Sequence, residues 1–386
     1  MDPRRLVGLY VHIPFCSVKC FYCDFTAFSG QSKSVSRYVA GLGQEARLKA
    51  GRVPDTLYIG GGTPSELSAQ QIGELYDLIG RFYPRSKFLE STFEVNPEST
   101  TGEKLSILRS CGVTRLSIGA QTLDDALLKS IGRRHTAKDL MDIYRQARSF
   151  DGWSVSIDLM YGLPDQTMPS FLKTLDDVLA LQPEHLSLYG LQVEDRTLFA
   201  KREVEPDEEL CRAMYEDALD RLNAAGYRHY EISNFAKPGF ESIHNQIYWH
   251  DGEYVGLGCG AASYLDGIRS TNLDRLPAYL SAVESGRLPV EQEEWLSGRD
   301  KLGETALLGL RMLDGFEPGP DIEREFSVEI GRLERKSLLK REGRRLRLTR
   351  EGVFLANQAF LEFVAPFQDV AEARVEQKPE PAGAIN

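Results

Sequence analysis

Residues 10–25 read YVHIPFCSVKCFYCDF and contain three of the six cysteines of the chain, Cys16, Cys20 and Cys23. The spacing of three residues and then two places three soft ligands on one short loop and supplies no fourth. A [4Fe–4S] cluster usually takes four thiolates, so three of them leave one iron with an open coordination position. An open iron beside bound S-adenosylmethionine is the arrangement that generates carbon radicals. The spacing therefore predicts a [4Fe–4S] cluster with one open iron.

A zinc knuckle and unligated core thiols are the alternatives for the same three cysteines. A structural zinc site needs four closed nitrogen or sulfur ligands. The nearest further candidate, His12, lies in the apolar run GLYVHIP (8–14), and we expect a strand there to point its side chain away from the loop. The cluster is therefore favoured. Cys111, Cys211 and Cys259 are scattered, and each is expected to be a buried small hydrophobic residue.

The overall composition is that of an ordinary globular protein. With 386 residues, 42% hydrophobic and 27% charged, the chain can form one large domain and a smaller one. A net charge of −11 argues against a general nucleic-acid binder, whose surface would be basic. No apolar run of about 18 residues occurs, and the N-terminal MDPRRLVGLYVHIP reads as a strand rather than a signal peptide. Together with the few cysteines, these features predict a cytoplasmic protein.

Short apolar runs alternate with amphipathic helical segments from residue 7 to about 225. Such alternation is typical of parallel β-α units, and six units suit a curved, incomplete barrel rather than a closed one of eight. We therefore predict an α/β fold with an incomplete (β/α)6 barrel over residues 1–225. The expected strands are 8–14, 56–61, 91–97, 115–120, 155–162 and 185–191, and the helices between them include 36–50 and 167–182.

Glycine and acidic residues follow several of these strands, at the edge where parallel sheets bind their ligands. The turn GGGTPS (60–65) lacks the lysine of a phosphate-binding loop, and its glycines let the backbone approach the amino-acid part of S-adenosylmethionine. Glu94 and Asp158 can accept hydrogen bonds from a ribose or an ammonium group. The alternatives are a tight connection for the glycines and solvated or ion-paired strand ends for the carboxylates.

Gln121 and two arginines follow the fourth strand in SIGAQTLDDALLKSIGRRHT (117–136). Gln121 can bond an adenosyl group, and Arg133 can hold the methionine carboxylate in a bidentate fork. Arg134 is adjacent, and the residues alone do not separate the two arginines.

The remainder of the chain divides into three further parts. Residues 226–296 contain the unusual stretch HNQIYWH, and residues 297–370 read as helices followed by a hairpin, which predicts a winged-helix-like domain. The basic run KREGRRLRLTR (340–350) lies in this hairpin, but one such cluster in an acidic chain is more often solvated, so no nucleic acid is expected as a partner. The polar tail 371–386 is expected to be disordered.

Seven motifs of this chain together resemble one family, the radical S-adenosylmethionine proteins related to oxygen-independent coproporphyrinogen III dehydrogenase. YVHIPFC, CFYC, GGGTPS, FEVNPE, RLSIGAQ, GRRHT and DLMYGLPDQT follow in the order and spacing of the family, over residues 10 to about 200. The resemblance implies that Cys16, Cys20 and Cys23 hold the cluster. It also implies that S-adenosylmethionine is contacted by Tyr10, Gly61, Gly62, Thr63, Glu94, Gln121, Arg133 and Asp158, with Tyr22 as an aromatic contact within the cysteine loop.

Two departures from the dehydrogenases resemble a heme-chaperone branch of the same family. The dehydrogenases carry a fourth cysteine two residues after the third, where this chain has Phe25, and only nine residues precede Tyr10 here. YEISNFAKPG (230–239) and HNQIYW (244–249) also resemble that branch, with Asn245 in the second position of its HNxxYW signature. The resemblance implies heme, a heme-acceptor protein that the sequence does not name, peripheral membrane association through that acceptor, and a flavodoxin-type electron donor.

HNQIYWH (244–250) places an imidazole and two large aromatic rings within one or two helical turns. Imidazole is a common heme ligand and aromatic rings suit a porphyrin face, so His244, Tyr248 and Trp249 are the heme-binding candidates. The alternative is an aromatic core helix in which His244 is a hydrogen-bonded spectator. His250 lies on another helix face and is the second candidate ligand.

We therefore expect a heme chaperone that binds a [4Fe–4S] cluster, S-adenosylmethionine and heme. The first rival is an enzyme of porphyrin biosynthesis that decarboxylates coproporphyrinogen III by hydrogen abstraction, against which Phe25 counts. A radical methyltransferase on the same scaffold and a DNA-binding regulator are weaker rivals. A product assay on coproporphyrinogen III and a salt-dependent gel shift distinguish them.

Overall fold

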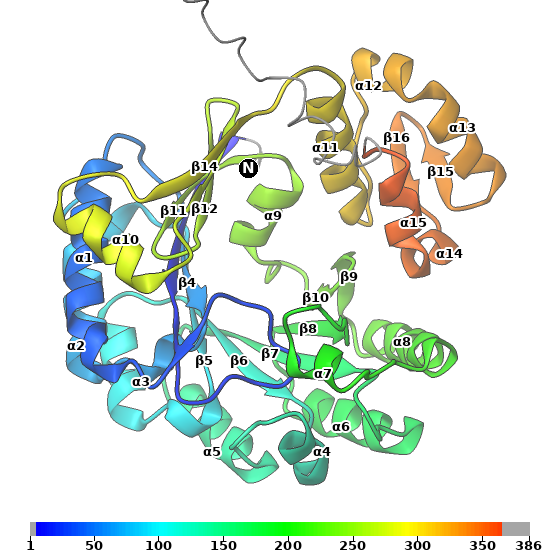
Figure 1. Ribbon diagram of the computed structural model, residues 1–386. Coiled ribbons are helices and arrows are strands. Elements are labelled where there is room, and N and C mark those ends of the chain that lie inside the picture. The colour runs from blue at the N-terminus through cyan, green and yellow to red at the C-terminus, as the bar shows by residue number, and fades with distance from the viewer. Residues whose placement is uncertain (1–4, 365–386) are drawn as a thin grey trace, which may run out of the picture. The chain divides into compact units, whose positions relative to one another are not determined.

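The computed structural model describes residues 5–364 (Figure 1). This part of the chain divides into two units: residues up to Leu296 together with Arg311–Asp314, and Ser297–Leu310 together with residues from Gly315 onward. The tail 371–386, which the sequence predicts to be disordered, lies outside the described residues. Among residues 5–364, no helix has the length and apolar character needed to cross a bilayer.

Six parallel strands form the centre of the first unit, in the order in which they occur along the chain. They confirm the six strands predicted from the sequence, with small shifts at the ends. They are β1 (Val7–Ile13), β4 (Thr56–Gly61), β5 (Glu90–Val95), β6 (Arg115–Gln121), β7 (Ser154–Tyr161) and β8 (His185–Gly190).

Helices connect these strands and lie along the outer side of the curved sheet (Figure 1). Four of these helices begin at a capping residue. The side-chain hydroxyl of the cap accepts a hydrogen bond from the backbone N–H three residues further along the chain, and the caps are Ser68, Thr101, Thr136 and Thr167. Each such cap contributes about 1 kcal/mol. The helices are α1 (Val35–Leu48), α2 (Ala69–Gly80), α3 (Gly102–Ser110), α4 (Asp125–Ser130), α5 (Ala137–Arg148) and α6 (Met168–Ala180).

The core of this unit lies between the sheet and its helices. Leu9, Leu57, Ile59, Phe93 and Leu116 come from four neighbouring strands and are fully buried. Leu57 pairs with Leu9, Ile59 with Phe93 in the next strand, so apolar side chains stand side by side across the sheet. A sheet covered in this way has near-continuous apolar strands, which is why the strands were readable in the sequence.

The predicted break at residue 225 is wrong, because residues 226–296 extend the same sheet at both edges. On one side β11 (Glu253–Leu257) pairs in parallel with β1, and β12 (Ala262–Leu265), β13 (Ile268–Asn272) and β14 (Val290–Trp295) follow in antiparallel order. On the other side β10 (Asn234–Ala236) and β9 (Arg228–Glu231) add to β8, giving twelve strands. An unpaired edge of β1 would leave its backbone groups without partners, and the later segment supplies them.

The remaining helices, strands and turns complete the first unit. They are β2 (Phe15–Cys16), β3 (Phe28–Ser29), α7 (Leu198–Lys201), α8 (Glu208–Ala224), α9 (Ile243–Trp249), α10 (Leu276–Glu284) and the 3-10 turns Ser32–Ser34, Pro64–Glu66, Arg85–Lys87 and Pro97–Ser99.

The second unit consists of helices and one hairpin around a small apolar core. Its buried side chains include Phe326, Ile330, Leu333 and Leu346. The basic run of the hairpin is neutralised locally, because Arg341 pairs with Glu323 and Glu334 of neighbouring helices. The elements are α11 (Gly298–Arg311), α12 (Pro320–Glu325), α13 (Ser327–Arg335), β15 (Leu339–Glu342), β16 (Arg345–Leu348), α14 (Arg350–Phe354) and α15 (Ala356–Leu361).

Candidate functional site

The cysteine loop, residues 16–27, follows directly after β1 at the carboxyl edge of the sheet. Cys16, Cys20 and Cys23 are half-buried, and none of them forms a disulfide. The backbone N–H of Cys23 donates to the carbonyl of Cys20 at 3.2 Å, which closes a turn between these two ligands. Burial raises the pKa of Cys16 to about 11 and also raises the pKa of Cys23. Without a bound metal ion, Cys16 and Cys23 are thiols, and binding of metal would release their protons.

The three thiols of the loop form an all-sulfur set of donors, which is the ligand chemistry of a [4Fe–4S] cluster. The residue beside Cys16 carries no side chain, because a Cβ on Gly62 would lie only 3.0 Å from the Cys16 sulfur. The residues present therefore fit such a cluster.

The glycine turn after β4 lies beside the cysteine loop and cannot carry side chains. A Cβ on Gly60 would lie 2.7 Å from the Tyr58 ring, and one on Gly61 would lie 2.6 Å from the His12 ring. Gly61 also has φ of +120°, which side-chain residues rarely adopt. Thr63 follows the turn, and its hydroxyl lies 3.3 Å from the Cys16 sulfur. The turn thus exposes backbone next to the thiols, as the predicted contact with S-adenosylmethionine requires.

Glu94 faces the same turn from β5. The Tyr58 hydroxyl donates to Glu94 Oε1 at 2.6 Å, and the N–H of Gly61 donates to Oε2 at 3.2 Å. Burial raises the pKa of Glu94 to about 7, and the nearby charge of Asp158 acts in the same direction. Glu94 therefore links the glycine turn to the strand beside it and titrates near neutral pH.

Arg133 is the arginine that reaches the site, whereas Arg134 is exposed to solvent. The Arg133 guanidinium donates to the Cys20 sulfur at 3.7 Å, to Gln121 Oε1 at 2.8 Å and to Asn96 Oδ1 at 3.1 Å. Gln121 adopts a φ of +61° at the end of β6, where the register with β7 shifts. In this left-handed backbone conformation the Gln121 amide oxygen accepts from Arg133. Backbone strain of this kind in a residue other than glycine often marks a functional position.

Asn96 belongs to this group, although the sequence did not single it out. Its amide donates to the Thr63 hydroxyl at 3.2 Å while its oxygen accepts from Arg133, so it joins the glycine turn to the Gln121 side of the site. The only signal was its place in the motif FEVNPE. A neutral amide after a strand looks like an ordinary turn residue.

Asp158, Tyr22 and Tyr10 are the remaining residues that the sequence predicts to contact the cofactor. Ser117 donates to Asp158 at 3.0 Å, and burial raises the pKa of Asp158. Tyr22 is half-buried against an apolar cluster that includes Ile131 and Phe199. Tyr10 projects from β1, and its hydroxyl lies 2.9 Å from His12 Nδ1.

His12 does not point away from the cysteine loop, contrary to the expectation from the sequence. Its Nε2 lies 2.8 Å from the carbonyl of Thr26, and its Nδ1 lies 2.9 Å from the Tyr10 hydroxyl. Residues two apart in a strand share a face, so His12 had to lie on the side of Tyr10. Both ring nitrogens have partners, and His12 therefore steadies the loop rather than offering a fourth ligand.

The three cysteines outside the loop are also resolved by the structure. Cys111 and Cys259 are buried as expected, but Cys211 is half-buried. It lies on α8 against Gly162, where a Cβ would approach its sulfur to 2.4 Å.

The aromatic motif HNQIYWH forms α9 and its C-cap, and His244 is buried within it, only 1% exposed. Its Nδ1 lies 2.7 Å from the Thr56 hydroxyl and its Nε2 lies 2.7 Å from the Tyr248 hydroxyl. Both nitrogens are therefore occupied, and burial lowers the pKa of His244 to about 3. The prediction that His244 ligates heme does not agree with this geometry, and the alternative of a hydrogen-bonded core histidine does.

Trp249 and His250 close the same helix and are half-buried. The Arg311 guanidinium lies 4.2 Å from the centre of the Trp249 ring, and the indole N–H has no hydrogen-bond partner among the described residues. His250 Nδ1 lies 2.8 Å from the carbonyl of Gln246, and its Nε2 makes no hydrogen bond within residues 5–364. Of the two histidines of the motif, His250 is the one with a nitrogen available.

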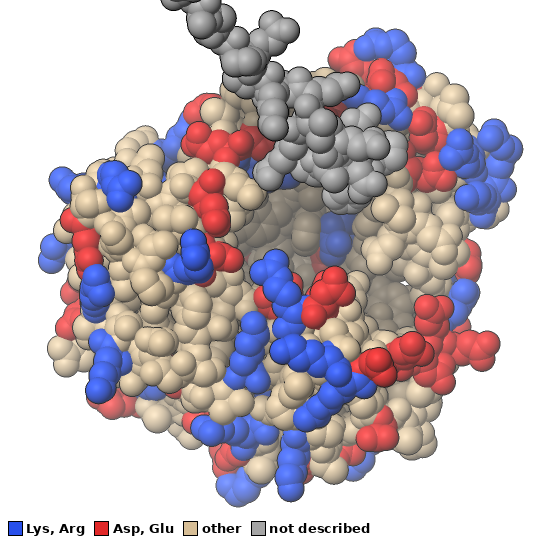
Figure 2. Space-filling model, viewed as in Figure 1, with Lys and Arg blue, Asp and Glu red and all other residues tan. Residues whose placement is uncertain are grey.

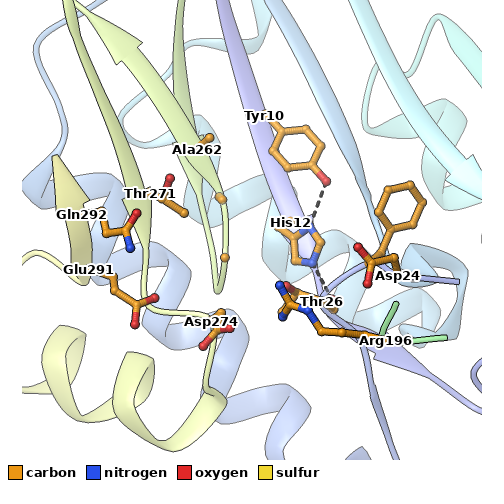
Figure 3. Close-up of a pocket in the computed structure, with 13 residues that line it drawn as sticks. Tyr10, His12, Asp24, Thr26, Arg196, Ala262, Thr271, Asp274, Glu291 and Gln292 are labelled. Carbon is orange, nitrogen blue, oxygen red and sulfur yellow. Dashed lines mark hydrogen bonds between the residues drawn. The ribbon is translucent and has the colours of Figure 1, made fainter. Parts of the chain in front are cut away.

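A cavity of about 450 Å³ opens beside β1, between the cysteine loop and the edge strands β12–β14 (Figure 3). Tyr10 and His12 form one wall, and Asp274 and Glu291 face them across the space (Figure 3). The full lining comprises Tyr10, His12, Asp24, Phe25, Thr26, Arg196, Gly260, Ala261, Ala262, Thr271, Asp274, Glu291 and Gln292. The lining contains three carboxylates and one guanidinium, so the cavity as a whole is acidic.

Comparisons with known proteins agree with this geometry. Residues 10–178 match the family described as the radical SAM superfamily, and residues 296–355 match the HemN C-terminal domain. A Bacillus subtilis protein named heme chaperone HemW is 37% identical over 373 residues, covering 92% of this chain and 98% of its own. The chain belongs to the HemW family. HemW of Lactococcus lactis is 38% identical over 370 residues, covering 92% of this chain and 96% of its own.

A solved structure confirms the predicted fold class. The coproporphyrinogen III oxidase HemN of Escherichia coli, described as a radical SAM enzyme, superimposes with a TM-score of 0.81 at 25% identity, covering 94% of this chain and 91% of that chain. Membership of the HemW family, and of the radical SAM superfamily that contains it, implies a [4Fe–4S] cluster and S-adenosylmethionine.

Proposed function

We propose that this protein is a heme chaperone: it binds a [4Fe–4S] cluster, S-adenosylmethionine and heme, and passes heme to an acceptor protein. The observation that carries the proposal is the similarity along nearly the whole chain to relatives named as heme chaperones. The cysteine loop supports it, because three thiols beside an open glycine turn suit a cluster with one free iron.

The residues described above would hold the cofactors as follows. Cys16, Cys20 and Cys23 bind three irons, and the cluster would supply an open iron that takes the amine and carboxylate of S-adenosylmethionine. Glu94 and Asp158 accept hydrogen bonds from the cofactor's polar groups. The other proposed contacts are Tyr10, Tyr22, Gly61, Gly62, Thr63, Gln121 and Arg133, to which the structure leads us to add Asn96.

Heme is the proposed cargo, and His250 is the ligand that we favour. His244 would have to break two hydrogen bonds and leave the core before it could reach iron, whereas His250 keeps Nε2 without a partner. Tyr248 and Trp249 remain candidates for contact with the porphyrin. We expect His250→Ala to shift the Soret band of the heme-loaded protein, and His244→Ala to leave that band unchanged.

The acceptor is a protein not named by the sequence, and the proposed setting is the cytoplasm, with membrane association only through that acceptor. The cluster would receive electrons from a small flavodoxin-type donor. Each of these statements rests on the family relationship and not on a contact in the structure.

A heme titration together with a product assay tests the function. Anaerobically reconstituted protein should bind about one heme per chain and should form no protoporphyrinogen from coproporphyrinogen III. The likeness to HemN makes the decarboxylase the specific rival. Turnover of coproporphyrinogen III, or heme binding that does not saturate, would return that rival to first place.

A further inference from the structure

Three segments of the first unit meet at Phe21 in the middle of the cysteine loop. The N–H of Phe21 donates to the carbonyl of Ile131 at 3.1 Å, and the N–H of Phe199 donates to the carbonyl of Phe21 at 3.0 Å. Gly132 packs so closely that a Cβ there would lie 2.9 Å from the Phe21 ring, and the Arg202 guanidinium lies 4.8 Å from the centre of that ring. The cysteine loop, the end of α4 and α7 therefore form one continuous surface.

This surface is basic, although the chain as a whole is acidic. Residues 17–25, 129–134 and 198–203 contain six Lys or Arg residues and two acidic ones, in a chain with 46 basic and 57 acidic residues. Lys and Arg side chains gather in the lower centre of the face in Figure 2, over the cysteine loop and α7. We call the exposed members the basic surface: Lys19, Lys129, Arg134, Lys201 and Arg202.

The charges of the basic surface are not neutralised by any other part of the chain that the structure describes. None of its five members forms an ion pair within residues 5–364; Lys19 bonds only to the carbonyl of Phe25 at 3.1 Å, and Arg202 lies over Phe21. Elsewhere, exposed cations such as Arg37 and Arg221 are paired with carboxylates. Unpaired cations are free to attract a partner, and they steer its approach over several ångströms at low salt.

Apolar side chains lie among these cations. Phe25 is 68% exposed and Leu198 is 37% exposed, from the cysteine loop and from the start of α7. A few exposed apolar side chains with a charged rim are typical of small, transient protein interfaces.

We propose that the basic surface is the docking site for a small acidic electron-carrier protein that reduces the cluster. The inference rests on the proposed function, since it requires the cluster on Cys16, Cys20 and Cys23. Electron transfer slows steeply with distance, and the cysteine loop is the part of the chain that would hold the cluster. A carrier that docks on the loop would therefore transfer its electron over a short distance. With a flavin carrier, one electron passes from the anionic hydroquinone to the oxidised cluster, the flavin becomes the neutral semiquinone, and no proton moves.

Charge reversal at the surface tests the docking site. The protein loaded with its cluster is mixed anaerobically with a flavodoxin in its hydroquinone form, and the rate of cluster bleaching is followed at increasing KCl. Lys201→Glu/Arg202→Glu should lower the second-order rate constant about tenfold at low salt, and the difference from wild type should disappear at high salt. The matched control is Arg81→Glu/Lys87→Glu, which changes the charge equally at two exposed residues outside the basic surface.

An uncharged reductant separates docking from damage. Photoreduction with deazariboflavin should proceed at the same rate in wild type and in both double variants, because it needs no protein interface. Equal flavodoxin rates for the two double variants would overturn the docking site. So would a loss of binding to phosphatidylglycerol vesicles with unchanged flavodoxin rates, since the surface would then face lipid. Absence of cluster absorbance in wild type would instead contradict the proposed function.

Discussion

At the scale of single residues, the burial of Glu94 bears on its proposed role in binding S-adenosylmethionine. Burial raises its pKa to about 7, so the carboxylate is mostly protonated at pH 6 and mostly ionised at pH 8. Only the ionised form can accept hydrogen bonds at both oxygens from Tyr58, Gly61 and a bound ribose or ammonium group.

We therefore expect the affinity for S-adenosylmethionine to rise about tenfold between pH 6 and pH 8, because the binding form of a group with pKa 7 increases by that factor. Isothermal titration of the anaerobic protein measures it. Glu94→Gln keeps an acceptor for Tyr58 but cannot ionise, so its affinity should be low and independent of pH. A wild-type affinity that falls as pH rises would contradict this role of Glu94.

The cysteines give a second prediction at this scale. Changing Cys16, Cys20 or Cys23 to Ala should abolish the brown absorbance of the reconstituted protein, because two thiolates do not hold the cluster. Cys111→Ala is the matched control, a buried thiol outside the loop, and should retain about four iron and four sulfide per chain. Full iron content in Cys20→Ala would refute the assignment.

The sequence was informative about residues wherever a motif fixed both the residue type and its place along a strand. The three thiols, the glycine turn and Glu94 all lie at the predicted edge of the sheet. Orientation was less accessible: Arg133 and Arg134 are neighbours, and only packing against Cys20 and Gln121 distinguishes them. Asn96 was missed because nothing in a single amide reveals that two loops meet on it.

At the scale of elements, α9 packs against β4 and β5, the strands that carry the glycine turn and Glu94, and we call this contact the brace. Its first turn is held by Glu90 of β5, which accepts from the backbone N–H groups of Ile243 and His244. Its imidazole bonds to Thr56 of β4 and lies against the Tyr58 ring, with ring centres 5.1 Å apart. Since Tyr58 holds Glu94, α9 and the glycine turn share one set of buried contacts.

Thr56→Val should therefore destabilise the protein by about 1–3 kcal/mol, because it leaves His244 Nδ1 buried without a partner. Urea unfolding of the protein measures the loss. Thr271→Val is the matched control, since the Thr271 hydroxyl makes no hydrogen bond within the described residues and its side chain is half-buried at an edge strand. Equal stability of the two variants would mean that the His244 contact contributes little.

The sequence did not predict this brace, although it identified the motif. An aromatic helix with one histidine has the same pattern whether it binds a ligand or packs in a core, and only the positions of Thr56 and Tyr248 distinguish these cases. Tyr248 follows His244 by four residues in the same helix, but Thr56 is 188 residues away from His244. No sequence pattern shows that second contact.

At the scale of the whole molecule, the sheet does not end where the six β-α units end. The strands after residue 225 are short, and their apolar patterns are too weak to reveal that they pair with β1 and β8. We predicted the boundary at 225 because the alternation of strands and helices ends there. In the structure the chain beyond this point pairs with the edge strands of the sheet, whose backbone groups would otherwise lack partners.

A chain that ends at residue 226 should therefore aggregate, because the edge of β1 and the apolar side chains facing β11 would be exposed. A chain that ends at residue 296 keeps all twelve strands of the sheet and serves as the control. Size-exclusion chromatography and thermal unfolding distinguish them. A monomeric 1–226 fragment with cooperative unfolding would restore the boundary that the sequence suggested.

The parallel pair of β1 and β11 also sets an order of events during protein synthesis. Val7 leaves the ribosome roughly 10 to 50 seconds before its partner Glu253 at ordinary translation rates. Throughout that interval the cysteine loop is attached to a strand with one open edge. We therefore expect a cluster bound by Cys16, Cys20 and Cys23 to be assembled only after most of the chain has been synthesised.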